Sequence, residues 1–190
     1  GLDPRIGKLF LNAGPGYGGS CLPKDISALI NFADKIGVNP LLLNAVKKTN
    51  HEQVNNIVSL MKKILGNIAT KRITVLGTAF KPNTDDIRDS KSIELIKKLL
   101  KNKAKITIHD PKAIENTKKI FGEKILYATS IADALNKSQC VIIMTHWKQY
   151  DTLNNNSIKH MSEKNIIDCK RVLVKKELDA KYYAIGIGKS

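Results

Sequence analysis

The sequence predicts an α/β protein, in which a helical segment with one long helix precedes a Rossmann-like domain built on a parallel sheet. Residues 71–190 alternate short apolar strands with amphipathic helices, a pattern typical of a parallel sheet covered on both faces. Residues 1–70 show helical periodicity, and the stretch from Gly66 to Lys71 separates the two patterns. We therefore expect two domains, residues 1–70 and residues 71–190, which a chain of 190 residues can accommodate.

The N-terminal segment is predicted to be a loop followed by a helix. Residues 1–22 are rich in glycine and proline, and Pro23 is a residue type favoured in the first turn of a helix. A helix over 23–36 would end at Gly37. Its apolar residues recur on one face: Ile26, Leu29, Ile30, Ala33 and Ile36.

A second, longer helix is predicted from Pro40 to Leu65. Its apolar residues have heptad-like spacing: Leu43, Val46, Ile57, Leu60 and Ile64. The polar residues Asn50 and Gln53 interrupt that seam. Such a helix needs a partner surface, either the core of its own domain or a second subunit, and the pattern is compatible with both.

The C-terminal segment has the pattern of a parallel sheet. Strands are predicted at 73–76, 106–108, 141–144, 166–167 and 182–187, and helices at 92–101, 112–121 and 130–135. Ligands of open parallel sheets bind at the carboxyl ends of the strands. The loop from Gly77 to Arg88 follows the first strand, and it offers the cations Lys81 and Arg88 to a ligand there.

Composition excludes several classes of protein. No apolar run reaches the roughly 20 residues of a membrane helix, and the N-terminus lacks the pattern of a signal peptide. We therefore expect no membrane association and a cytoplasmic location. Three widely spaced cysteines without a CxxC pair argue against a disulfide framework and against a metal site.

The formal net charge of +15 is compatible with a polyanionic partner. The lysines are scattered, however, and aromatic residues make up only 5% of the chain, so no stripe of cations and stacking aromatics is present. We expect no nucleic acid as a partner, whereas a nucleotide diphosphate would suit the positive field. A basic nucleic-acid binder remains the rival hypothesis, and it leaves the glycine-rich loop unexplained.

The stretch from Gly14 to Asp25 carries the strongest chemical signal. It fits GxGxxG, but no strand precedes it and a helix follows, so it is not a dinucleotide fingerprint. We interpret it as a glycine-rich loop that exposes backbone amides and brings Cys21 to the start of a helix. A helix N-terminus and the adjacent Lys24 favour a thiolate, and Asp25 could activate a water. From the residues alone, a structural cysteine is an equally good interpretation.

Three motifs in order resemble the UDP-glucose and GDP-mannose dehydrogenase family. Gly-Tyr-Gly-Gly-Ser-Cys-Leu-Pro-Lys-Asp, residues 16–25, resembles its catalytic-cysteine motif. Residues 77–90 are similar to the signature that opens its C-terminal nucleotide-binding domain, and Pro4-Arg5-Ile6-Gly7 is similar to a segment upstream of the cysteine. Asp168-Cys-Lys-Arg171 is a shorter match. The resemblance covers essentially the whole chain.

The resemblance implies oxidation of a sugar C6 alcohol to a carboxylate, with NAD as the cofactor used twice. It makes Cys21 the nucleophile that captures the aldehyde as a thiohemiacetal, which becomes a thioester after the second hydride transfer. Asp25 would assist the hydrolytic water. Lys24 and Arg88 would contact NAD.

The same resemblance implies the substrate contacts. The backbone of the loop would cradle the sugar and its phosphates, Arg5 would enter the site of the neighbouring subunit, and further side chains would hold the nucleotide. The substrate-binding residues expected in this way are Arg5, Phe10, Leu11, Asn12, Gly18, Phe80, Lys81 and Arg171.

The family also has an NAD-binding N-terminal domain that these 190 residues do not contain. The resemblance therefore implies the C-terminal portion of a UDP-glucose 6-dehydrogenase, inactive alone, with a cysteine and dimerisation segment over 1–70 and a UDP-sugar domain over 71–190. We expect a homodimer formed through the helix over 40–65. The alternatives are an enzyme for GDP-mannose or another nucleotide sugar, and a stand-alone nucleotide-sugar binding or dimerisation module.

Overall fold

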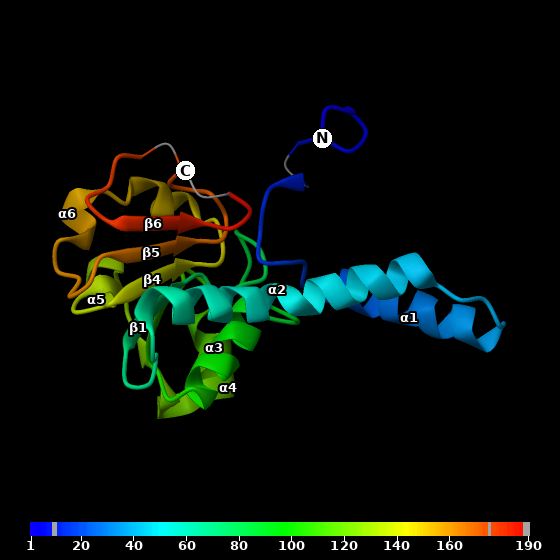
Figure 1. Ribbon diagram of the computed structural model, residues 1–190, viewed down its shortest axis with the longest axis horizontal. Coiled ribbons are helices and arrows are strands. Elements are labelled where there is room, and N and C mark those ends of the chain that lie inside the picture. The colour runs from blue at the N-terminus through cyan, green and yellow to red at the C-terminus, as the bar shows by residue number, and fades with distance from the viewer. Residues whose placement is uncertain (9–10, 175, 188–190) are drawn as a thin grey trace.

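A computed structural model describes residues 1–8, 11–174 and 176–187. A helical arm, residues 22–50, projects from an α/β body (Figure 1). The helices are α1 (Leu22–Lys35), α2 (Leu41–Leu65), α3 (Lys91–Lys101), α4 (Ile114–Phe121), α5 (Ile131–Leu135) and α6 (Asn155–Ile158), with 3-10 turns η2 (Gly122–Lys124) and η3 (Lys148–Thr152). The strands are β1 (Arg72–Leu76), β2 (Lys105–His109), β3 (Leu126–Tyr127), β4 (Cys140–Ile143), β5 (Asn165–Asp168) and β6 (Lys181–Ala184).

The sheet has six strands in the order β3-β2-β1-β4-β5-β6, and every pairing is parallel. β1 pairs with β2 on one side and with β4 on the other, so the strand order reverses at β1. A crevice forms at the carboxyl ends of strands where the order reverses, and such crevices bind ligands. The predicted Rossmann-like fold is confirmed, and its strand order reverses between β1 and β4.

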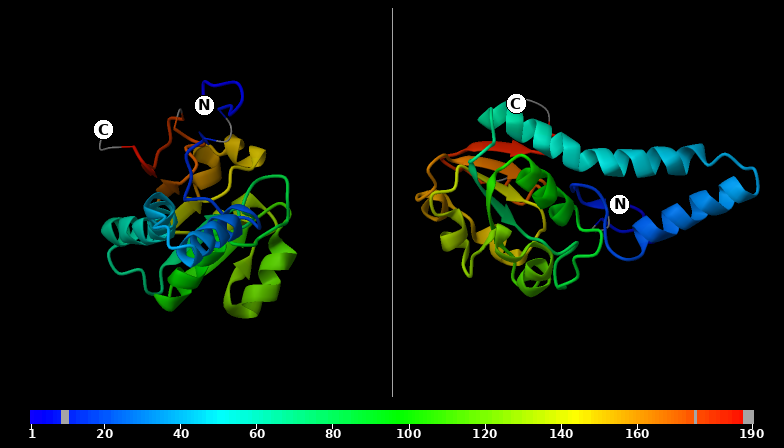
Figure 2. Two further views of the ribbon diagram at one scale, coloured as in Figure 1. Left: turned by 90° about the vertical axis from the view of Figure 1, so that its right-hand side faces the viewer. Right: turned by 90° about the horizontal axis from the view of Figure 1, so that it is seen from below.

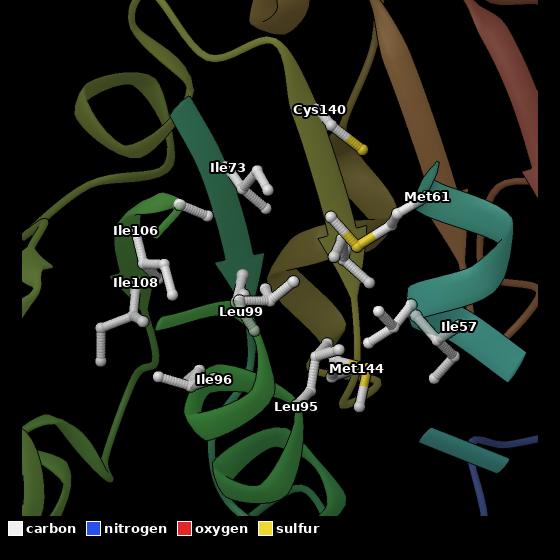
Figure 3. Close-up of a cluster of buried hydrophobic side chains, with 14 of the residues drawn as sticks. Ile57, Met61, Ile73, Leu95, Ile96, Leu99, Ile106, Ile108, Cys140 and Met144 are labelled. Carbon is white, nitrogen blue, oxygen red and sulfur yellow. The ribbon is translucent and has the colours of Figure 1, made fainter. Parts of the chain in front are cut away.

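Two layers of helices cover the sheet. α2, α3 and α4 pack on one face, where Ile73 and Val75 are buried. Ile73 and Ile106 lie in the same cluster as Leu99 of α3 and Met61 of α2 (Figure 3). α5, η3 and α6 cover the other face, where Leu76 and Val141 are buried. Successive strand residues alternate between the two cores, as the geometry of a β-strand requires. The apolar strands of the sequence are therefore buried from both sides.

The long helix α2 lies in two different environments. Its C-terminal half packs on the sheet, where Val54 and Met61 are 0% exposed. Its N-terminal half pairs with α1 in the arm and leaves Leu41 72% exposed (Figure 2). Half of the helix is thus a core helix, and the other half presents apolar side chains without a partner in the described residues. No helix in those residues is both long enough and apolar enough to cross a membrane.

The described elements differ from the predicted ones mainly at their ends. The helix predicted over 112–121 begins at Ile114, because the Asp110 carboxylate accepts hydrogen bonds from the backbone amides of Lys112 and Ala113. The strand predicted over 182–187 ends at Ala184, before Gly186 turns the chain with a φ of +71°. Strand β3 and helix α6 are too short to produce a periodic pattern.

We predict that Leu99→Ala lowers the free energy of unfolding by about 2–5 kcal/mol, because it leaves a cavity between α3 and the sheet. Leu99 is 0% exposed. Urea denaturation followed by circular dichroism measures the change. Lys97→Ala, on the exposed side of the same helix, is the control and should change the stability by less than about 0.5 kcal/mol. Equal effects of the two substitutions would contradict the assigned core.

Candidate active site

The cysteine loop, residues 13–20, lies beside the carboxyl ends of the strands and next to the β1–α3 loop, residues 77–90 (Figure 1). The Gly19 amide donates a hydrogen bond of 3.0 Å to the Arg88 carbonyl. Pro15, Gly16 and Gly18 line a small cavity together with residues of the β1–α3 loop and of α3. The two motifs, distant in sequence, thus form one site.

The glycines of the cysteine loop are required by protein packing. A Cβ on Gly18 would lie 2.3 Å from the Asp89 carbonyl oxygen, and one on Gly19 would lie 2.6 Å from the Phe80 ring. Real Cβ atoms do not approach that closely. We interpreted these glycines as room for a ligand, and the structure adds a reason that the sequence did not reveal. They let two loops come into backbone contact.

Cys21 is the N-cap residue of α1, and its side chain is exposed. The Ser20 hydroxyl lies 3.6 Å from the Cys21 sulfur. The Asp25 amide donates to the Cys21 carbonyl at 2.8 Å, and the Asp25 carboxylate lies 3.3 Å from the Lys24 ammonium. The site therefore presents an accessible thiol at a helix N-terminus, with a cation and a carboxylate on the first turn of the same helix.

The other two cysteines are buried, Cys140 in β4 and Cys169 directly after β5. Burial raises the pKa of the Cys140 thiol to about 12 and also raises the pKa of Cys169. Both thiols are therefore protonated at neutral pH and packed in the core. Cys21 is the accessible nucleophile of the three.

Arg88 is close to Cys21 and is held by Asp86. The Arg88 guanidinium donates to both carboxylate oxygens of Asp86, at 2.7 and 3.0 Å. These bonds lower the pKa of Asp86. The hydrogen bonds and the charge of Asp86 raise the pKa of Arg88. The Arg88 side chain is nevertheless 68% exposed, so it can also contact a bound molecule.

Asp110, at the end of β2, fixes the β1–α3 loop. Its buried carboxylate accepts hydrogen bonds from the Thr78 and Ala79 amides, at 2.6 and 3.0 Å, and from the Trp147 indole at 3.2 Å. Sequence reasoning missed this residue. An aspartate before a proline, directly after a strand, was the available signal, because such residues bind nearby backbone amides. Asp110 therefore orders the backbone that leads into Phe80.

The predicted substrate residues Phe80 and Lys81 lie at this loop. Phe80 is half-buried beneath Gly19, and its amide donates to the Asp86 carbonyl at 3.0 Å. The Lys81 ammonium lies 5.3 Å from the centre of the Phe80 ring, within the range of a cation–π contact. Lys81 itself is exposed, so its charge is available to a ligand.

The segment after β5 brings a second lysine to the site. The Lys170 ammonium lies 2.6 Å from the position of a Cβ on Gly14, and burial lowers the pKa of Lys170. The neighbouring Arg171, which we expected at the nucleotide, donates from Nε to the Ile185 carbonyl at 3.0 Å and is exposed. Lys170 is thus turned toward the cysteine loop, whereas Arg171 is turned toward the loop that follows β6. Sequence reasoning missed Lys170.

The remaining predicted residues lie in the N-terminal segment. Arg5 is exposed and forms a bidentate pair with Asp3, at 2.7 and 3.0 Å. Leu11 and Asn12 are exposed. Phe10 lies outside the described residues. In the described chain, no contact joins Arg5 to the site around Cys21.

Comparison with known proteins shows two matches to one family. Residues 74–175 match the UDP binding domain of the UDP-glucose/GDP-mannose dehydrogenase family, and residues 1–52 match its central domain. The first match alone covers more than half of the chain.

Individual relatives agree. The chain is 39% identical to UDP-glucose 6-dehydrogenase of Rickettsia felis, over 98% of this chain and 43% of that protein. It is 41% identical to UDP-glucose 6-dehydrogenase of Haloferax volcanii, over 93% of this chain and 40% of that protein. A UDP-glucose dehydrogenase structure from Pyrobaculum islandicum superposes with a TM-score of 0.88 at 34% identity, covering 99% of this chain and 42% of that one.

The chain thus spans less than half the length of these relatives. Both matched domains occur in the order predicted from the cysteine motif and the β1–α3 signature. The chain belongs to the UDP-glucose/GDP-mannose dehydrogenase family.

Proposed function

We propose that this chain is the C-terminal part of an NAD-dependent UDP-glucose 6-dehydrogenase. The observation that carries the proposal is the position of Cys21, an exposed thiol at the start of α1, beside the β1–α3 loop of a UDP binding domain. Residues 1–70 would form the cysteine and dimerisation segment, and residues 71–190 the nucleotide-sugar domain. The relatives named above support UDP-glucose as the substrate.

In the proposed reaction, the Cys21 sulfur adds to the carbonyl carbon of the C6 aldehyde and forms a thiohemiacetal. Oxidation of this adduct leaves a thioester on Cys21. Asp25 then takes a proton from the water that attacks the thioester, the carbon–sulfur bond breaks, and the carboxylate and the free thiol are released. The exposed position of the Cys21 side chain at the start of α1 gives its sulfur access to the aldehyde in the first step.

NAD would supply the acceptor for both hydrides. The described residues can contact only one edge of the cofactor. Protein atoms occupy the space beside the glycines of the cysteine loop, and no strand precedes that loop in the described residues, so it is not a dinucleotide-binding loop. Lys24 and Arg88 have side chains that are 73% and 68% exposed, and they are the proposed contacts of a cofactor bound mainly by another domain. We therefore propose that this chain supplies the thiol and the sugar site, and that another part of the enzyme supplies the dinucleotide site.

The nucleotide sugar would bind across the two loops. Lys81 and Lys170 supply positive charge for its diphosphate, and Phe80 supplies an apolar surface. Gly18 and the backbone around Leu11 and Asn12 remain the proposed sugar contacts. In the alternative hypothesis, the nucleotide of the bound sugar is GDP.

The arm is the proposed dimer interface, with a second copy of this chain as its occupant. Large apolar side chains are exposed on both helices and on the turn between them: Leu22, Leu29, Phe32, Ile36, Val38, Leu41, Leu42 and Val46. Large exposed apolar side chains that gather on one part of a protein favour a protein–protein contact there. In such a dimer, Arg5 is the proposed contribution to the site of the neighbouring subunit.

We predict that Cys21→Ser in the full-length protein lowers kcat for UDP-glucose oxidation by about a thousandfold or more, because the hydroxyl is a much weaker nucleophile. NADH formation at 340 nm measures the rate. Cys140→Ala, which removes a buried thiol, is the control and should retain most of the activity. Full activity of Cys21→Ser would contradict the role of Cys21 as the nucleophile, whereas a full-length wild type that binds UDP-glucose without oxidising it would support a nucleotide-sugar binding module.

We predict that UDP raises the melting temperature of the 190-residue chain and that GDP does so less at the same concentration. A ligand at 100 times its Kd stabilises the folded state by about 2.7 kcal/mol. Lys170→Ala should weaken the shift by UDP, whereas Lys97→Ala, on the outside of α3, should not. A larger shift with GDP would reassign the substrate class.

We predict that Leu42→Glu shifts the chain from dimer to monomer, because the charge would be buried in the proposed interface. Leu42 is 75% exposed in the single chain, so the folded monomer tolerates the substitution. Light scattering after size-exclusion chromatography gives the mass. Leu126→Glu is the matched control, since Leu126 is 68% exposed on β3, outside the arm. Monomeric wild-type chain would refute the interface.

A further inference from the structure

We infer that Asn50 is a positioning residue for the loop that carries Cys21. Asn50 is one of the two polar residues that interrupt the apolar seam of α2, and the proposed reaction does not use it directly. The inference deepens the proposed function, and its consequence for catalysis rests on that function. Its consequence for the order of the cysteine loop is independent of the proposed function.

The Asn50 side chain holds the cysteine loop through both of its polar groups. The Tyr17 amide donates to Asn50 Oδ1 at 2.8 Å, and Asn50 Nδ2 donates to the Tyr17 carbonyl at 3.1 Å. One side chain thereby satisfies both backbone groups of one loop residue, as a neighbouring β-strand would. Tyr17 precedes Cys21 by four residues.

The fit around this contact is tight. A Cβ on Gly16 would lie 2.4 Å from Asn50 Oδ1, and Gly16 has a φ of +107°, in the region that favours glycine. The cysteine loop therefore comes closest to α2 at Asn50, the residue that bonds Tyr17. A side chain at position 16 would be strained by the positive φ and would clash with the Asn50 amide.

Asn50 lies where α2 passes from the core into the arm. Val54, one turn after it, is 0% exposed, whereas Val46, one turn before it, is 36% exposed. The cysteine loop is thus attached to the first turn of α2 beyond the packed sheet. Its second attachment is the bond from the Gly19 amide to the Arg88 carbonyl. Together the two attachments fix the chain on either side of Gly18, three residues before Cys21.

The residue type matters because the contact needs one donor and one acceptor on a short side chain. Asparagine supplies both, whereas a carboxylate supplies acceptors alone and an apolar side chain supplies neither. Asparagine is also an unfavourable residue in the interior of a helix, so its position in the middle of α2 calls for such a compensating contact.

The test uses Asn50→Leu in the 190-residue chain, because leucine has the same number and branching of side-chain heavy atoms as asparagine, lacks its donor and acceptor, and favours the helix. We expect the Tyr17 amide to exchange with deuterium about tenfold faster, while the amides of β1 and β4 keep their protection. Mass spectrometry of the peptide over residues 12–20 measures the exchange. In the full-length enzyme, the same substitution should lower kcat for UDP-glucose oxidation about tenfold or more.

Two further variants sharpen the result. Asn50→Asp keeps the acceptor for the Tyr17 amide, so its exchange rate should lie between those of Asn50→Leu and the wild type, and this order also decides the matter if Asn50→Leu fails to fold. Asn55→Leu is the control, because Asn55 bonds only Glu52 of its own helix in the described contacts. Unchanged Tyr17 exchange in Asn50→Leu, or equal acceleration in Asn55→Leu, would overturn the inference. An inactive wild-type enzyme would count against the proposed function and leave the exchange result intact.

Discussion

The site depends on the backbone contact between two loops that are about 70 residues apart in sequence. The Gly19 amide bonds the Arg88 carbonyl, and the Asp89 carbonyl occupies the space that a side chain on Gly18 would need. Because the contact is between backbone atoms, the two loops lie closer together than they would if side chains packed between them. The start of α1, and with it Cys21, therefore has a defined position relative to the carboxyl ends of the strands.

Each partner in this contact is itself fixed to a rigid element. Asp110 binds the β1–α3 loop to the end of β2, and Asn50 binds the cysteine loop to α2. β2 and α2 share one hydrophobic core. The two loops of the candidate site are thus linked to the hydrophobic core, which is the arrangement a site needs to hold its residues in place.

Much of the fold was predictable from the sequence, because the strands and main helices have clear apolar periodicity. β3 and α6 were missed since two and four residues cannot show a period. The sequence also could not show that only the C-terminal half of α2 packs in the core, because the apolar residues have the same spacing in both halves of the helix. At the site, the motifs predicted which segments meet. They could not predict that Lys170 rather than Arg171 turns toward the cysteine loop, because the orientation of two adjacent side chains depends on the positive φ of Arg171.

The continuity of α2 has a mechanical consequence. Its 25 residues form a rod of about 37 Å that begins among the exposed apolar residues of the arm and ends in the core beneath the sheet. Asn50, which bonds the cysteine loop, lies on this helix where the arm meets the core. A tilt of the arm would therefore move the Asn50 side chain and, through the Tyr17 contact, the loop that precedes Cys21.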